Sequence, residues 1–385
     1  MLLSGMKTLL ARGAMVLCLL PVALRPVTAQ TPSFEDLVRR AQAALDSRPA
    51  EAAGLYRQAL GIRPTWAEGW FYLGAALYQT DRYAEASDAF RKGLELSPKV
   101  GSGWAFLGLC EAELDNIDQA LSDIGKGLEL GVGDNWPFQV AVRVKAAQLY
   151  IRSASFDQAL AQLHPLALHG ENSPGLVDTM GLCALGIPAA LSEIPPQRRA
   201  VVELAGKAAW ALADQRPAEA LAAYRQLLEK YPNEPGVHYA YGLYLMETDL
   251  AGALAEFQRE VRNNPKHWPT LILLGSLQTR QGAAEAAIQT LRLALKTVPA
   301  KQRWLCHAEL GQAYVAADKV DAAIPEFEAA VRLKPMNAPM HYLLLQAYRR
   351  AGRQEDAEKQ AAEFRKLKVK EDPLGVPGLL PEGQR

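Results

Sequence analysis

Histidine side chains are the groups in this sequence best suited to metal binding or proton transfer. His238, His307 and His341 occupy a position that recurs along the chain, and Trp70 and Trp104 hold the same position in earlier segments. This periodic placement favours a flat, amphipathic ring that fills an aromatic packing site. We therefore interpret these histidines as packing residues, with a metal-binding or acid–base role as the alternative.

Local signatures of catalysis are absent from the sequence. It contains no H-E-x-x-H, G-x-S-x-G, G-x-x-x-x-G-K-[ST] or G-x-G-x-x-G motif. His164 and His169 flank Pro165 at a spacing that suits shared metal ligation on a helix poorly. We predict a protein that is not an enzyme and that needs no cofactor and no metal. The alternative, an enzyme, would have its chemistry in the irregular region 131–199.

Three cysteines lie beyond the N-terminal segment: Cys110, Cys183 and Cys306. The first two each stand two residues after a glycine, Gly108 and Gly181, and so hold corresponding helical positions. We expect them to be small buried hydrophobic residues. Outside the cytoplasm an odd number of thiols leaves one unpaired, so a reactive or intermolecular role is the alternative.

A repeat of about 34 residues positions these side chains. Many helical segments close with a proline, and each following segment carries an alanine at a matching place. The prolines are Pro64, Pro98, Pro232, Pro265, Pro299 and Pro335, and the alanines are Ala52, Ala86, Ala120, Ala159, Ala220, Ala253, Ala287, Ala323 and Ala357. Two residue types thus keep one period, which indicates copies of one structural unit.

Each unit has the pattern of two antiparallel helices. In residues 67–100, Leu73, Gly74 and Leu77 share one helical face. Asp81 marks the turn, because aspartate tolerates the left-handed conformation that ends a helix. Gly74 and Ala86 are small, so we expect the two helices to cross closely at this point.

These units resemble the tetratricopeptide repeat. The resemblance rests on Tyr72-Leu73-Gly74 with Ala86 and Pro98, and it recurs in later units. The recurrences are Phe106-Leu107-Gly108 with Ala120, Leu273-Leu274-Gly275 with Ala287 and Pro299, and Glu309-Leu310-Gly311 with Ala323 and Pro335. It implies an all-α fold, namely a right-handed superhelical solenoid of antiparallel helix pairs whose first helices line an inner groove.

The pattern divides the chain into two expected arrays. Residues 30–187 form an N-terminal array whose last units are degenerate, and residues 201–371 form a C-terminal array that ends in a charged capping helix. Residues 188–200 contain three prolines and predict a loop or hinge between the arrays. Residues 372–385 are rich in proline and glycine, and we expect them to be disordered.

The repeat register predicts which side chains line the inner groove. They are Phe71, Tyr78, Leu109, Tyr239, Leu243, Met246, Ile272, Tyr342 and Gln346. This set is mainly apolar and aromatic, which suits a peptide segment whose apolar side chains enter pockets. The chain has 42 Lys and Arg against 42 Asp and Glu, and this balance argues against a nucleic-acid partner.

Residues 1–29 have the features of a secretory signal peptide. Lys7 and Arg12 give a cationic start, an apolar stretch follows, and small residues end at Ala29, before Gln30. The apolar stretch is about half of the ~20 residues that a membrane-spanning helix needs. We expect a periplasmic or secreted protein without a transmembrane segment after cleavage. An uncleaved anchor is the alternative.

Together these features predict a non-catalytic scaffold. It would bind an extended or helical segment of another protein in its concave groove. The resemblance to exported bacterial members of the repeat family implies a place in the cell envelope or outside. The alternative within this setting is a structural, docking component of an envelope assembly or secretion machine.

Overall fold

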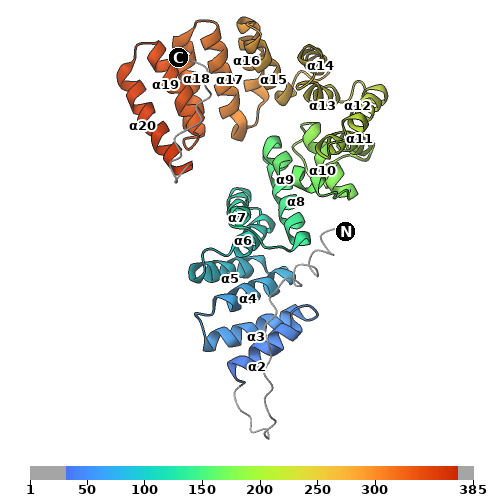
Figure 1. Cartoon of the computed structure of the whole chain (residues 1–385), viewed down its shortest axis with the longest axis vertical. Coiled ribbons are helices and arrows are strands. Elements are labelled where there is room, and N and C mark those ends of the chain that lie inside the picture. The colour runs from blue at the N-terminus through green and yellow to red at the C-terminus, as the bar shows by residue number, and fades with distance from the viewer. Residues whose placement is uncertain (1–31, 372–385) are drawn as a thin grey trace. The chain divides into compact units, whose positions relative to one another are not determined.

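A computed structural model of the chain describes residues 32–371 (Figure 1). Within this range all regular structure is helical, and no strand is present. The all-α solenoid of paired helices that the sequence predicts is therefore confirmed. The expected signal peptide, residues 1–29, and the expected disordered tail, residues 372–385, lie outside the described range.

None of the helices in residues 32–371 is both long and apolar enough to cross a membrane.

The chain divides into two compact units. Unit 1 comprises residues up to Arg152 together with Asp157–Asn172, and unit 2 comprises Ser153–Phe156 and the chain from Ser173 onward. Each unit has its own stack of helices.

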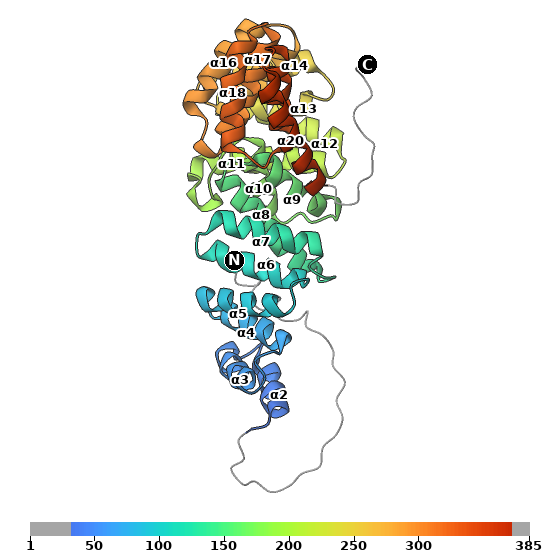
Figure 2. The same cartoon turned by 90° about the vertical axis from the view of Figure 1, so that its left-hand side faces the viewer.

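Unit 1 is a series of antiparallel helix pairs. Its helices are α2 (Phe34–Ala44), α3 (Pro49–Ile62), α4 (Ala67–Gln79), α5 (Tyr83–Leu96), α6 (Gly101–Glu113), α7 (Ile117–Leu130), α8 (Trp136–Arg152) and α9 (Phe156–Leu168), whose first residue belongs to unit 2. From α2 to α7 each helix packs on the next, and the pairs follow one another in layers (Figure 2). Aromatic rings join the layers: Phe106 of α6 stacks on Phe90 of α5 and on Phe138 of α8.

Unit 2 consists of a series of antiparallel helix pairs preceded by one additional helix. Its elements are α10 (Pro174–Ala184), the short 3-10 helix η2 (Leu191–Glu193), α11 (Pro196–Ala213), α12 (Pro217–Lys230), α13 (Val237–Leu245), α14 (Leu250–Asn263), α15 (Trp268–Arg280), α16 (Ala284–Thr297), the 3-10 helix η3 (Ala300–Gln302), α17 (Arg303–Ala316), α18 (Val320–Leu333), α19 (Ala338–Arg350) and α20 (Gln354–Glu371). The pairs from α11/α12 to α19/α20 follow the repeat, and α10 precedes them.

Left-handed residues make the turns inside the pairs. Asp81 has a φ of 59°, as the sequence predicts, and it lies two residues before α5 begins. The same place before later second helices is held by Asp115, Ala154, Gln215, Gly282, Asp318 and Gly352, all with positive φ. Between α13 and α14 the connection has four residues, 246–249, where the pairs with these left-handed residues have three, and Asp249 caps α14 by accepting a hydrogen bond from the Gly252 amide at 2.9 Å.

The helices of a pair cross at the predicted glycine and alanine. A large side chain of the second helix also lies against the glycine. The ring of Phe90, on the second helix, lies over Gly74, where a Cβ would come within 2.8 Å of the ring. Phe257 and Phe327 lie over Gly242 and Gly311 in the same way. The space that the glycine leaves is thus filled by a large side chain one turn beyond the periodic alanine, which is itself buried.

Residues 188–200 do not separate the two units. The boundary lies near 153–173, and 188–200 is an internal connection of unit 2 that joins α10 to α11. The reason is a backbone contact between these helices: a Cβ at Gly181 would lie 2.0 Å from the carbonyl oxygen of Val202, and one at Gly206 would lie 2.1 Å from that of Val177. Pro196 begins α11 rather than breaking a helix, because proline is well tolerated at the first helical position.

Candidate functional site

Part of the predicted groove is inaccessible. Tyr78, Leu109, Tyr239 and Ile272 expose 4%, 0%, 6% and 4% of their surface. Tyr78 meets the edge of Phe106 on the next first helix, and Tyr239 packs against Phe257 of its own repeat and against His267. The prediction that these four side chains line an open groove is wrong, since all four are buried.

The remaining predicted residues are at least partly accessible. Phe71 is half-buried, because its ring fills the space beside Gly93 and Gly103. Leu243, Met246 and Gln346 are also half-buried, whereas Tyr342 is 44% exposed and packs against Phe364 of α20. Except for Phe71, all of these lie on first helices of unit 2.

Equivalent positions on the four first helices α13, α15, α17 and α19 form two accessible rows. One row stands next to the crossing position and contains Leu243, Ser276, Gln312 and Gln346, and the other lies one turn further and contains Met246, Thr279, Val315 and Arg349. All eight are half-buried or exposed. We call these eight residues the first-helix surface. It is apolar on α13 and becomes polar and basic on α19.

Ser276 and Gln312 were missed by the sequence analysis, which selected large apolar side chains. The signal that identifies them is their register, since each follows the crossing glycine of its own helix, Gly275 or Gly311. A polar contact also joins the two helices there: Ser276 hydrogen-bonds the side chain of Glu309. This hydrogen bond lowers the pKa of Glu309, but burial has the larger effect and raises it.

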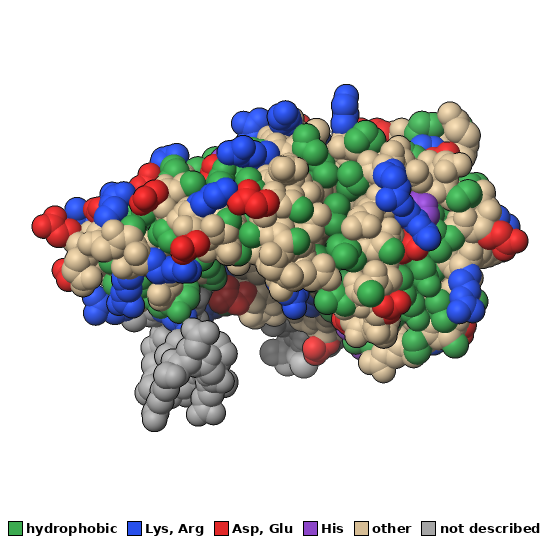
Figure 3. Space-filling view, turned by 90° about the horizontal axis from the view of Figure 1, so that it is seen from above, with side chains coloured by type: hydrophobic (Ala, Val, Ile, Leu, Met, Phe, Trp, Pro, Cys, Tyr) green, Lys and Arg blue, Asp and Glu red, His purple; other side chains and the backbone are tan. Residues whose placement is uncertain are grey.

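Charge is dispersed over the surface. On the face drawn in Figure 3, basic and acidic side chains are interspersed with hydrophobic ones. Lys92 of α5 lies over the indole ring of Trp70 at 4.6 Å from its centroid, and Lys126 of α7 lies over that of Trp104 at 3.6 Å. These lysines therefore contribute to packing within a repeat.

The periodic histidines connect the two helices of a repeat. Nδ1 of His238 lies 2.6 Å from Oε2 of Glu256, and Nδ1 of His307 lies 2.6 Å from Oε2 of Glu326. His341 contacts Gln360 at the matching place, and its Nε2 donates to the carbonyl oxygen of Pro335 at 2.9 Å.

The tryptophans at this position make the equivalent backbone contact. Nε1 of Trp70 donates to the carbonyl of Pro64, and Nε1 of Trp104 donates to that of Pro98, both at 2.8 Å. The histidine rings thus occupy the packing position that the sequence analysis assigned to them. No group of three or more His, Cys, Asp or Glu side chains suited to a metal ion occurs within residues 32–371.

The cysteines are buried, as expected. Burial raises the pKa of the Cys110 thiol, and it raises that of Cys306 to about 12. Both thiols are therefore protonated at neutral pH and are poor nucleophiles. Sγ of Cys306 donates to the carbonyl oxygen of Leu291 at 3.4 Å.

Buried polar groups hold the end of α10 against the following repeats. Nε2 of His267 donates to the carbonyl oxygen of Leu185 at 3.2 Å, and its Nδ1 lies 2.6 Å from Oγ1 of Thr270. Burial lowers the pKa of His267 to about 4, so the ring is neutral at physiological pH. Nearby, Oε1 of Glu260 accepts from the Gly236 amide at 2.8 Å, and burial raises the pKa of this carboxyl.

The geometry defines an α-helical repeat protein, and the sequence comparisons identify the repeat. Models of the tetratricopeptide repeat match residues 67–100, 204–267 and 247–301. A model described as bacterial transcriptional activator domain matches residues 297–377, a range that includes the helix pairs α17/α18 and α19/α20. The chain therefore contains tetratricopeptide repeats in both units, within residues 67–100 and 204–301. Such repeats support a role as a protein-interaction scaffold.

Solved structures of MamA are similar to part of this chain. The MamA RS-1 ArsTM double mutant is 20% identical over 46% of this chain and 98% of its own, with a TM-score of 0.41. MamA 41-end from Desulfovibrio magneticus RS-1 is 21% identical over 47% of this chain and 99% of its own, with a TM-score of 0.39. No curated protein matches the chain.

Proposed function

We propose that this protein is a non-catalytic scaffold that binds an extended or helical segment of a partner protein on the first-helix surface of unit 2. The observation that carries the proposal is the continuous accessibility of that surface over four consecutive repeats. Leu243 and Met246 lie on it beside the core residues Tyr239, Phe257 and Leu274 and remain partly uncovered. Such side chains present apolar anchors without requiring the core to open.

The opposite end of the surface differs in chemistry. Gln312, Gln346 and Arg349 offer hydrogen-bond donors, and Arg349 carries a positive charge. A segment with an apolar half and a polar or acidic half complements this arrangement. Because the repeats hold the surface in place, little conformational entropy is lost from the scaffold on binding.

We place this activity outside the cytoplasm. The support is the sequence of residues 1–29, which has the charge, the apolar stretch and the small residues of a cleavable signal peptide. In this setting the partner is another envelope or secreted protein.

Site-specific photocrosslinking in intact cells tests the binding surface. A photoreactive residue at position 243 or 346 is expected to trap the same partner, whereas one at Gln258 or Gln289, exposed on second helices, is the matched control. Leu243→Asp with Met246→Asp should abolish the crosslink from position 346 while circular dichroism is unchanged. Equal trapping from the second-helix positions would contradict the proposal.

A further inference from the structure

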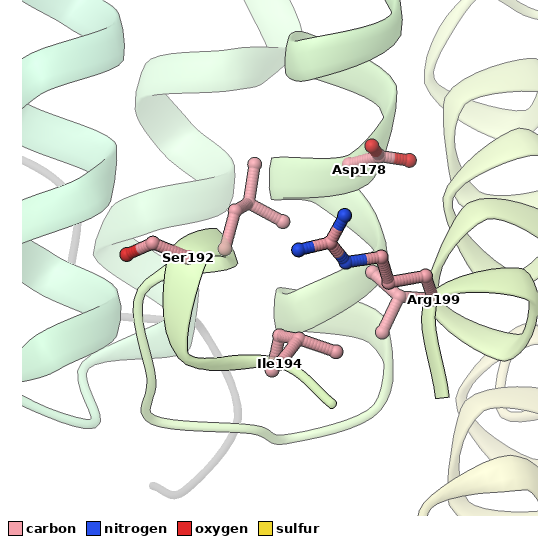
Figure 4. Close-up of a pocket in the computed structure, with 6 residues that line it drawn as sticks. Asp178, Ser192, Ile194 and Arg199 are labelled. Atoms are coloured by element: carbon pink, nitrogen blue, oxygen red, sulfur yellow. The ribbon is translucent and has the colours of Figure 1, made fainter. Parts of the chain in front are cut away.

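A small pocket lies where the chain departs from the repeat. It is formed by α10, η2 and α11 of unit 2, and its volume is about 280 Å³ (Figure 4). The lining residues are Asp178, Leu191, Ser192, Ile194, Arg199 and Val202. Leu191, Ser192 and Ile194 come from the connection between the two helices, Asp178 comes from α10, and Arg199 and Val202 come from α11.

Two opposite charges at this pocket, Asp178 and Arg199, form no ion pair among the described residues. Oδ1 of Asp178 is buried and accepts no hydrogen bond, and burial is the main cause that raises the pKa of this carboxyl. The charge of Glu203 also raises this pKa, whereas Arg199 and Lys207, which pairs with Glu203 at 2.6 Å, oppose the shift. Arg199 is exposed and forms no ion pair among the described residues. Figure 4 shows Asp178 from α10 and Arg199 from α11 beside the same space.

Apart from Ser192, the rest of the lining is apolar. Leu191, Ile194 and Val202 contribute aliphatic side chains to the same pocket. A ligand that satisfies this set needs a cationic group for Asp178, an anionic group for Arg199 and a small aliphatic part. A simple cation would leave the guanidinium unmatched, and a simple anion would leave the carboxylate unmatched.

We propose that this pocket binds a free aliphatic α-amino acid. The ammonium donates to Asp178, the carboxylate accepts a bidentate pair of hydrogen bonds from Arg199, and the side chain contacts the three aliphatic residues. The pocket is at the small end of the range of ligand sites, which fits one amino acid. An internal peptide segment carries neither charge on its backbone, and each end of a peptide carries only one of the two. This site shares no residue with the first-helix surface, so amino-acid binding can be tested independently of the proposed function.

Isothermal titration calorimetry of the full chain tests the site with leucine as the probe. Leucinamide, which lacks the carboxylate, and 4-methylpentanoate, which lacks the ammonium, are the matched compounds. We expect leucine to bind, and each matched compound to bind at least tenfold more weakly. This comparison uses the unaltered protein and does not depend on the folding of any variant.

Substitutions then assign the two contacts. Asp178→Asn and Arg199→Gln should each weaken leucine binding at least tenfold, while Glu219→Gln, at an exposed ion pair with Arg216, should change it less than twofold. Arg199→Gln should not weaken leucinamide binding further. Absence of leucine binding at millimolar concentration overturns the proposal, as does leucine binding that survives both substitutions. A crystal structure in which Asp178 and Arg199 form an ion pair that closes the pocket would also overturn the proposal.

Discussion

Gly181 of α10 and Val202 of α11 are in backbone contact: a Cβ on residue 181 would lie 2.0 Å from the Val202 carbonyl oxygen. At Gly74 the corresponding neighbour is the end of the Phe90 ring, 2.8 Å away, which can move. The two glycines hold the same place in the sequence pattern, yet only at Gly181 is backbone the obstacle. This contact holds the extra helix α10 against the array that follows it.

Gly181→Ala should therefore destabilise unit 2 strongly. We expect a loss of at least about 3 kcal/mol in unfolding free energy, because two backbones must separate. Gly74→Ala should cost about 1 kcal/mol, since a ring can shift. Chemical denaturation followed by circular dichroism measures both. Gly125→Ala is the control: a Cβ added there would meet nothing within 4 Å, so the change should stabilise α7 by about 0.5–1 kcal/mol. Similar losses at positions 181 and 74 would contradict the distinction.

Replacing a left-handed non-glycine turn residue should stabilise the fold. Gln215 has a φ of 58° and an exposed side chain, so Gln215→Gly removes backbone strain without removing packing. We expect a gain of about 0.5–1 kcal/mol in thermal or chemical denaturation, after allowing for the greater entropy of glycine in the unfolded chain. The reverse change at the equivalent turn, Gly282→Ala, should cost about 1 kcal/mol. A loss of stability in Gln215→Gly, or no loss in Gly282→Ala, would contradict the prediction.

His267 should make stability depend on pH. Its pKa is about 4 in the folded protein and about 6.5 when exposed, because burial disfavours the charged ring more than the hydrogen bond to Leu185 favours it. The unfolded state therefore binds the proton more readily, and stability falls as pH drops from 6.5 to 4, by on the order of 3 kcal/mol.

The raised pKa of Glu260 acts in the opposite direction, since that carboxyl favours folding when it is protonated. The measurement is thus the difference in unfolding free energy between the unaltered chain and His267→Gln across this pH range. The difference should shrink towards acid pH. A difference independent of pH would show that His267 does not titrate in this way.

Tyr239 and Tyr342 were expected to act together in binding, but the structure separates their roles. Tyr239→Ala should lower stability by about 3 kcal/mol or more, because its buried ring packs against Phe257 and His267. Tyr342→Ala should change stability by less than about 1 kcal/mol, since 44% of its surface is exposed. Chemical denaturation of both variants measures these losses. Equal losses of stability in the two variants would contradict the prediction.

The N-terminal segment gives a prediction that is independent of the fold. If residues 1–29 are a cleaved signal peptide, then intact-mass measurement of the protein from the periplasm or medium should show Gln30 as its first residue. A protein that retains Lys7 and Arg12 in the membrane fraction would instead be anchored.

The sequence by itself determined the repeat and the local features within it. Asp81, Pro64 and Pro98 act through their own backbone preferences, which hold wherever the residue stands in a chain, so turns and helix ends follow from them. The recurrence of the histidines along the repeat likewise predicted their place on first helices, where each contacts the second helix of its own repeat.

Tertiary structure decided which surfaces remain open and where the array begins. Tyr239 and Leu243 share one predicted groove, but Tyr239 is buried against Phe257 and His267, whereas Leu243 stays partly accessible. The pairing of α10 with α11, and the pocket at Asp178 and Arg199, likewise depend on segments that approach one another only in the folded chain. Burial is a property of the neighbours of a residue in space, and the spacing of residues along a helix does not specify those neighbours.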